Sequence, residues 1–152
     1  DALEDKALKQ AASLIDSTLT CAKYQTLVHG DAKLANFCFD DTESLVAAVD
    51  FQYVGHGCAM KDVALFMSSA VEPEACSEME SWVLDIYFAE LRHALQIYQP
   101  QLDAKAVEQE WRPLFPVAWA DFQRFVKGWS PGHWKIHSYR SAGSLPWPCA
   151  KP

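Results

Sequence analysis

The stretch that most constrains this chain runs from Leu27 to Phe51, where polar residues stand at the edges of short apolar segments. Asp31 follows one such segment, Asn36 precedes the next, and Asp50 closes a third. Loops at the ends of strands present side chains to ligands. Two carboxylates and an amide placed in this way can hold Mg²⁺ beside a nucleophile, because hard oxygen ligands suit this ion. The stretch therefore indicates phosphoryl transfer.

Size and composition favour one globular domain over residues 1–152, with half of the residues apolar and 22% charged. The net charge of −7 and the scattered basic residues argue against a nucleic-acid partner. No apolar run approaches the roughly 20 residues of a membrane span, and no signal peptide is visible. Five cysteines, an odd number without a CxxC pair, favour a reducing compartment. We therefore expect a cytoplasmic protein without a membrane partner.

The local patterns predict a mainly helical α+β fold with one small β-hairpin. Short strands are expected at 24–28 and 37–39, and the apolar run 45–49 is consistent with a buried strand. Polar residues 40–44 predict the hairpin turn, and Gly55 and Gly57 predict a flexible connection. The hairpin thus carries candidate ligand groups at both of its ends.

Helical spacing predicts helices over residues 2–17 and 60–69. Ser77 and Glu80 form a capping box that would open a third helix, stopped by Pro100. This helix should bury one apolar face, formed by Met79, Trp82, Val83, Ile86, Tyr87, Leu91, Ala94 and Tyr98.

Further along, Asp103 is expected to cap another helix, which Pro113 and Pro116 must break or kink. Helical spacing then continues to Gly128. The residues that follow predict a loop-rich tail.

Phosphoryl transfer mostly requires positioning and charge neutralisation, which assigns roles to these residues. Asp31 is the candidate base that orients the acceptor hydroxyl and takes its proton. Asn36 and Asp50 are the candidate Mg²⁺ ligands. Lys33 could reach the transferred phosphate as a point charge, and His29 is a hydrogen-bonding brace for the loop.

The motif His29-Gly30-Asp31 through Asn36, followed by Asp50-Phe51-Gln52, resembles the catalytic loop and metal-binding segment of aminoglycoside phosphotransferase and choline kinase-like enzymes. Among these relatives of protein kinases, ecdysteroid kinase-like members are most similar. Protein kinases carry arginine where this chain has Gly30, and glycine where it has Gln52. Lys61-Asp62-Val63-Ala64 also resembles a segment of the family in which the aspartate braces the catalytic loop.

The resemblance implies a protein-kinase-like C-terminal lobe, with ATP as phosphoryl donor, Mg²⁺, and a small-molecule hydroxyl as acceptor. It also implies an N-terminal lobe whose glycine-rich loop, lysine and glutamate hold the nucleotide. No glycine-rich stretch precedes His29. We therefore expect the C-terminal lobe alone, inactive without its N-terminal lobe or a partner chain that replaces it.

Several other interpretations compete with this one. A catalytically silent binding module could keep the shape of the lobe, although it would need none of Asp31, Asn36 and Asp50. Tryptophans at 111, 119, 129 and 134 could bind a quaternary ammonium, but helix packing explains them more simply. Glu110 and Asp121 could hold a cationic substrate or stand as solvated helix positions.

Overall fold

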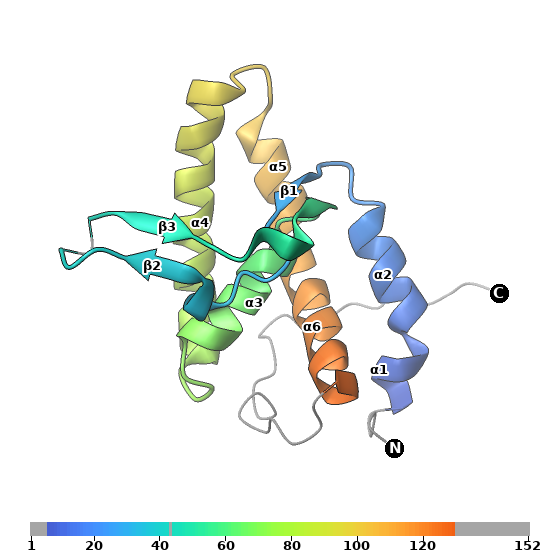
Figure 1. The fold of residues 1–152 in the computed structure, drawn as a ribbon. Coiled ribbons are helices and arrows are strands. Elements are labelled where there is room, and N and C mark those ends of the chain that lie inside the picture. Colours follow the sequence, from blue (N-terminus) through green and yellow to red (C-terminus); the bar gives the residue numbers. More distant parts are fainter. Residues whose placement is uncertain (1–5, 43, 130–152) are drawn as a thin grey trace.

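The computed structural model describes residues 6–42 and 44–129, and this part of the chain is mostly helical (Figure 1). The mainly helical fold class is therefore confirmed. The helices are α1 (Lys6–Gln10), α2 (Ala12–Thr20), α3 (Met60–Ala70), α4 (Cys76–Tyr98), α5 (Ala104–Trp111) and α6 (Phe115–Trp129). Three short 3₁₀ helices complete the set: η1 (Leu34–Asn36), η2 (Phe51–Tyr53) and η3 (Arg112–Leu114).

Four short strands form two separate antiparallel ribbons. Strand β1 (Thr26–Val28) pairs with β4 (Gly55–Gly57), and β2 (Phe37–Phe39) pairs with β3 (Val46–Ala48). The prediction of a flexible connection at Gly55 and Gly57 is wrong, because these glycines pair with Val28 and Thr26 across the first ribbon. This pairing brings the segment after Asp50 back beside the strand that leads into His29.

The predicted hairpin of β2 and β3 is present, but the prediction of a buried strand at 45–49 is wrong. Leu45 and Val46 are 71% and 60% exposed. The physical reason is visible in Figure 1, where this hairpin projects away from the helices instead of lying between them. The apolar run therefore predicts a strand correctly here, but it does not predict that the strand is buried.

The predicted first helix is divided by a turn at Ala11 and runs further, to Thr20. It continues because Ile15 and Leu19, one helical turn apart, are both buried in the core. Residues 2–5 of that prediction lie outside the described residues.

The capping box predicted at Ser77 and Glu80 is wrong, since α4 already begins at Cys76 and its N-cap residue is Ala75. Backbone bonds from Ala75 to Glu72 and from Cys76 to Pro73 wind the chain before the serine is reached. The buried side chains of α4 are Cys76, Leu84 and Phe88.

The face expected for α4 is confirmed in part, because Met79, Val83, Tyr87 and Leu91 pack against the core. Trp82, Ile86 and Tyr98 of that face are 57%, 46% and 76% exposed. Tertiary contacts, which spacing alone does not reveal, select Leu84 and Phe88 in their place.

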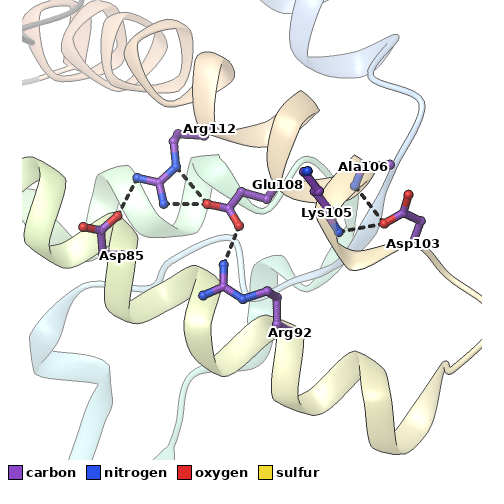
Figure 2. A network of polar contacts seen from close by, with 7 residues as sticks. All are labelled: Asp85, Arg92, Asp103, Lys105, Ala106, Glu108 and Arg112. Carbon is purple, nitrogen blue, oxygen red and sulfur yellow. Dashed lines mark hydrogen bonds and ion pairs between the residues drawn. The ribbon is translucent and has the colours of Figure 1, made fainter.

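The second half of the chain follows the sequence patterns more closely. Asp103 caps α5, accepting hydrogen bonds at Oδ1 from the backbone N–H groups of Lys105 (2.9 Å) and Ala106 (3.3 Å), as Figure 2 shows. Pro113 lies in η3, which separates α5 from α6 as expected. The predicted tail after Trp129 lies outside the described residues, so the single domain over 1–152 stays a prediction.

The core lies where α6 packs against α3 and α2, with α4 on the other side of α3 and α5 packed against α4 (Figure 1). Phe88, Phe115, Met60 and Met67 are fully buried there. Complete burial of such side chains contributes about 1.5–3 kcal/mol each. The core makes α3 a rigid platform for the loops described below.

The tryptophans divide into two groups. Trp111 and Trp119 are 3% and 4% exposed, which confirms helix packing for both. Trp129 is 74% exposed, and Trp134 lies outside the described residues.

A charged network fastens α5 to α4 (Figure 2). Glu108 accepts from Arg92 at 2.5 Å and from Arg112 at 2.7 Å, while Arg112 also reaches Asp85 at 2.9 Å. Hydrogen bonding from Arg112 lowers the pKa of Glu108, and the guanidinium lies 4.9 Å from the Phe88 ring centroid. Each exposed pair contributes about 0–1 kcal/mol, so the network fixes orientation more than stability.

Replacing Phe115 by alanine should lower the free energy of unfolding by about 3–5 kcal/mol, because a fully buried aromatic ring is lost. The measurement is urea-induced unfolding. Phe125→Ala on the same helix is the matched control, since Phe125 is 56% exposed and its ring stacks against the exposed Trp129. Its cost should be about 1 kcal/mol or less. Equal losses in the two variants would contradict the described core.

Candidate active site

The site is built on the loop of residues 29–33, here called the HGD loop, which leads from β1 into η1. Gly30 has a φ of +81°, a left-handed conformation that favours glycine. A Cβ atom at this position would lie 2.3 Å from the carbonyl oxygen of Tyr53. Glycine is therefore required twice, by its own backbone and by the close approach of η2.

Asp62, in the first turn of α3, holds the start of this loop. Its Oδ2 accepts from the backbone N–H of His29 at 2.6 Å, and its Oδ1 accepts from that of Gly30 at 3.0 Å. A carboxylate that takes two N–H groups makes strong, charge-assisted hydrogen bonds. Asp62 thus fixes the direction in which the chain enters Asp31.

Asp31 is the centre on which other polar groups converge. Its Oδ2 accepts from the Lys33 ammonium at 2.7 Å and from the Asn36 amide nitrogen at 3.1 Å. The hydrogen bond from Lys33 is the largest cause that lowers the pKa of Asp31, against an opposing contribution from burial. Asp31 is consequently ionised at neutral pH and able to accept a hydrogen bond from a hydroxyl.

Asn36 is the buried polar residue of the described chain, with 6% of its surface exposed. Its amide nitrogen also donates to the backbone carbonyl of Asp31 at 2.8 Å. The hydrogen bonds assign the nitrogen side of the amide to Asp31, which leaves the carbonyl oxygen as the group available to a cation. The backbone of Asn36 is also held, because its backbone carbonyl oxygen accepts a hydrogen bond from the Val49 N–H at 2.9 Å.

His29 connects the two halves of the site. Its Nδ1 accepts from the backbone N–H of Asp31 at 3.2 Å, and its Nε2 lies 2.9 Å from the carbonyl oxygen of Val49. These partners require the neutral ring with its proton on Nε2, because Nδ1 must accept while Nε2 donates. His29 therefore links the HGD loop to the residue that precedes Asp50.

Asp50 has φ 66° and ψ 55°, which makes it the positive-φ non-glycine residue of the described chain. Backbone strain of this kind is found at functional sites. Its charge reaches the same centre, because Asp50 contributes to the raised pKa of Lys33 after the larger effect of Asp31. The structure thus brings Asp31, Lys33 and Asn36 into direct contact, with Asp50 close enough to act on Lys33 electrostatically.

Asn36 and Asp50 fit Mg²⁺ in the type of their oxygen donors. Within residues 6–42 and 44–129, no group of three His, Cys, Asp or Glu side chains could hold a metal ion. Two protein ligands suit Mg²⁺, which keeps several waters and binds substrate phosphates in its remaining positions. The donor set therefore fits a cation whose remaining positions are filled by waters or by phosphate oxygens.

Other candidates from the sequence have different roles. Glu110 accepts from the backbone N–H groups of Lys23 (2.7 Å) and Tyr24 (2.9 Å), and Trp111 Nε1 donates to Tyr24 O at 2.9 Å. Both earlier interpretations of Glu110 are wrong, because it clasps the segment that leads into β1. Its partners lie more than 80 positions away in the chain, so no local pattern could reveal them.

Asp121 is also neither a solvated position nor an open carboxylate, since it pairs with Arg124 at 2.8 Å and Lys61 at 3.6 Å. Tyr53, whose backbone closes over Gly30, is a part of the site that the sequence did not single out. The approach of Tyr53 depends on the pairing of β4 with β1, which no local pattern predicts.

The sequence profile of the ecdysteroid kinase-like family matches residues 1–100, which include all of the site residues described above. The chain belongs to this family, and membership indicates a kinase-like phosphotransferase. Searches of curated proteins and of solved structures found no match. No helix of the described residues is long and apolar enough to cross a membrane.

Gly30→Ala should cost about 2–4 kcal/mol of unfolding free energy, because left-handed backbone strain adds to the overlap with Tyr53. Gly128→Ala is the matched control, since a Cβ there meets nothing within 4 Å and the residue lies in α6. That variant should gain about 0.5–1 kcal/mol, as alanine does in helices. Chemical denaturation measures both, and a loss at Gly128 as large as that at Gly30 would contradict the argument.

Lys33→Met should raise the pKa of Asp31 toward its ordinary value of 3.8, because the largest cause of the lowered pKa is removed. In the wild type, a pKa lowered by folding stabilises the protein above the unfolded pKa, and this contribution is lost as the pH falls through the lowered value. A ¹³C NMR titration of the Asp31 carboxyl group measures the shift. Lys61→Met, which removes a partner of Asp121 instead, should leave the pKa of Asp31 in place. An unchanged pKa in Lys33→Met would contradict the assigned cause.

Proposed function

We propose that this chain is the catalytic lobe of an ATP-dependent phosphotransferase that transfers a phosphoryl group to a hydroxyl of a small molecule. The observation that carries the proposal is the convergence of Lys33 and Asn36 on one carboxylate oxygen of Asp31. This arrangement brings together the ionised carboxylate of Asp31, the ammonium group of Lys33 and the side-chain amide of Asn36. Phosphoryl transfer requires this combination, because it depends on orientation and on neutralised charge.

Asp31 would receive the acceptor hydroxyl in a hydrogen bond and take its proton as the hydroxyl oxygen bonds to the γ-phosphorus and the bond from that phosphorus to ADP breaks. A carboxylate with a low pKa is a weak base in the ground state, so its first contribution is to orient the hydroxyl. Lys33 is 43% exposed at its side chain and can turn from Asp31 toward an incoming phosphate. This exchange would leave Asp31 free for the acceptor at the moment when the phosphate is in place.

Asn36 and Asp50 would hold Mg²⁺ through the amide carbonyl and the carboxylate. The ion would supply neutralisation of the charge on the transferred phosphate. The buried position of Asn36 and its two bonds to Asp31 keep the amide from rotating. The strained backbone of Asp50, linked through Val49 to His29, aims the second ligand.

A nucleotide-binding lobe, within the same protein or supplied by a partner chain, would complete the site. Support comes from the apolar surface next to the HGD loop, where Leu27 is 75%, Phe51 56% and Tyr53 63% exposed. Leu45 and Val46 on the hairpin are exposed as well. Apolar residues gathered in this way mark sites of interaction. The chain alone should therefore show no robust ATP-dependent phosphorylation, and such activity would contradict this part of the proposal.

Cytoplasmic location remains part of the proposal. It is supported by Cys21, Cys38, Cys58 and Cys76, which are all free thiols, as expected in a reducing compartment. The alternative function, a catalytically silent binding module, lacks a reason to keep Asp31, Asn36 and Lys33 in mutual contact.

Asp31→Ala, in the protein joined to its nucleotide-binding lobe, should lower phosphorylation about 10²–10⁴-fold, the usual contribution of a general base. Radiolabelled transfer from ATP to a panel of hydroxylated small molecules measures it. The control is Asp41→Ala, which removes an exposed carboxylate from the hairpin turn. Unfolding midpoints of both variants should stay close to the wild type. Turnover retained in Asp31→Ala would remove Asp31 from the role of base.

A further inference from the structure

Helix α3 presents three residues of one face to the HGD loop and the turn that follows it. Asp62, Phe66 and Ser69 are spaced by four and three positions, so they lie above one another on the helix surface. Asp62 holds His29 and Gly30, and Phe66 meets the ring of Phe37 edge-on at 5.5 Å. Ser69 Oγ accepts from the backbone N–H of Leu34 at 2.8 Å.

The contact with Ser69 answers a local need of η1. The first N–H groups of a helical turn have no partner within the turn and require an external acceptor. Lys33 occupies the N-cap position of η1, and its side chain makes no capping hydrogen bond. Ser69, 35 positions away in the chain, therefore takes the place of a local capping residue. Its hydroxyl is fully engaged, because it also donates to the carbonyl of Phe66 at 2.9 Å.

The turn capped by Ser69 is the one that carries Asn36. Within η1, the backbone N–H of Asn36 bonds to the carbonyl of Lys33 at 2.9 Å, so the orientation of the turn sets the orientation of the amide. Asp62 and Ser69 are separated by roughly 10 Å along the helix axis. The segment from His29 to Leu34 is thus held at both ends by a single rigid element.

We propose that Ser69 is a positioning residue that fixes η1 and thereby aims the Asn36 carbonyl at the cation. The proposal rests on the function proposed above, because it concerns the metal-binding role of Asn36. Ser69 and Leu34 are both exposed, so their hydrogen bond contributes little to global stability. Its loss should therefore loosen the turn without unfolding the chain.

The test compares Ser69→Ala with two variants of the 152-residue chain. Ser68→Ala is the matched control, since the Ser68 hydroxyl donates only to Leu65 of its own helix at 2.7 Å. Ser69→Thr retains the hydroxyl and should behave as the wild type. Amide exchange by ¹H–¹⁵N NMR reports on the Leu34 N–H, and Mn²⁺ titration reports on the cation site through paramagnetic broadening of amides near Asn36.

In Ser69→Ala, exchange of the Leu34 amide should accelerate about fivefold, the equivalent of one hydrogen bond of about 1 kcal/mol. The Mn²⁺ concentration that gives equal broadening near Asn36 should rise several-fold. Ser68→Ala and Ser69→Thr should change neither readout, and the urea midpoint should be the same in all variants.

Two results would overturn the role of Ser69. The first is equal Leu34 exchange in Ser69→Ala and Ser68→Ala, and the second is faster exchange with unchanged broadening by Mn²⁺. Failure of the proposed function has a different signature. Wild-type chain that shows no Mn²⁺ broadening near Asn36 would contradict the cation site and with it the aiming role of Ser69, whereas the Leu34 exchange would still decide whether Ser69 caps η1.

Discussion

The carboxylate of Asp62 is the constraint on which the rest of the site depends. Two consecutive backbone N–H groups can reach one carboxylate only if the chain turns sharply, and Gly30 makes that turn with its positive φ. The carboxylate itself is fixed because α3 packs against α6 through fully buried side chains such as Met60 and Met67. These two hydrogen bonds therefore fix the loop to a helix that the hydrophobic core holds in place. They set the direction of the chain after Gly30.

From that anchor, a chain of polar contacts passes through the site. Asp62 holds His29, whose ring joins the backbone of Asp31 to the carbonyl of Val49. Asp50 follows Val49 in the chain, and these contacts support its strained backbone. The His29 ring therefore links Asp31 and Asp50, because it bonds to the backbone of Asp31 and to that of Val49, the residue before Asp50. The arrangement gives the two carboxylates a common frame.

The candidate residues Asp31, Lys33 and Asn36 could be singled out together from the sequence because their spacing is local. Asp31, Lys33 and Asn36 lie within one loop and one turn, so contact between them follows from short-range geometry. Contacts between residues far apart in the chain could not be predicted from local sequence patterns. The clasp of Glu110 on Tyr24 and the cap of Ser69 on Leu34 join segments far apart in the sequence, and neither residue has a distinctive neighbourhood.

The errors in the fold have the same origin. Apolar residues 45–49 specify a strand but not what covers it, and the hairpin projects from the helices with Leu45 and Val46 exposed. On α4, packing buries Leu84 and Phe88 beside part of the expected apolar face and leaves Trp82, Ile86 and Tyr98 exposed. Local chemistry was sufficient only where a single residue determines the outcome, as at the Asp103 cap.

We propose that Asn36 and Asp50 form the cation side of a phosphoryl-transfer site that α3 orients. A crystal structure of the protein with its nucleotide-binding lobe, Mg²⁺ and a non-hydrolysable ATP analogue tests it most directly. We expect Mg²⁺ to contact the Asn36 side-chain carbonyl oxygen and the Asp50 carboxylate, with the Asp31 carboxylate facing the terminal phosphate. Mg²⁺ and phosphates bound elsewhere, with Asn36 and Asp50 making no contact to the ion, would contradict it.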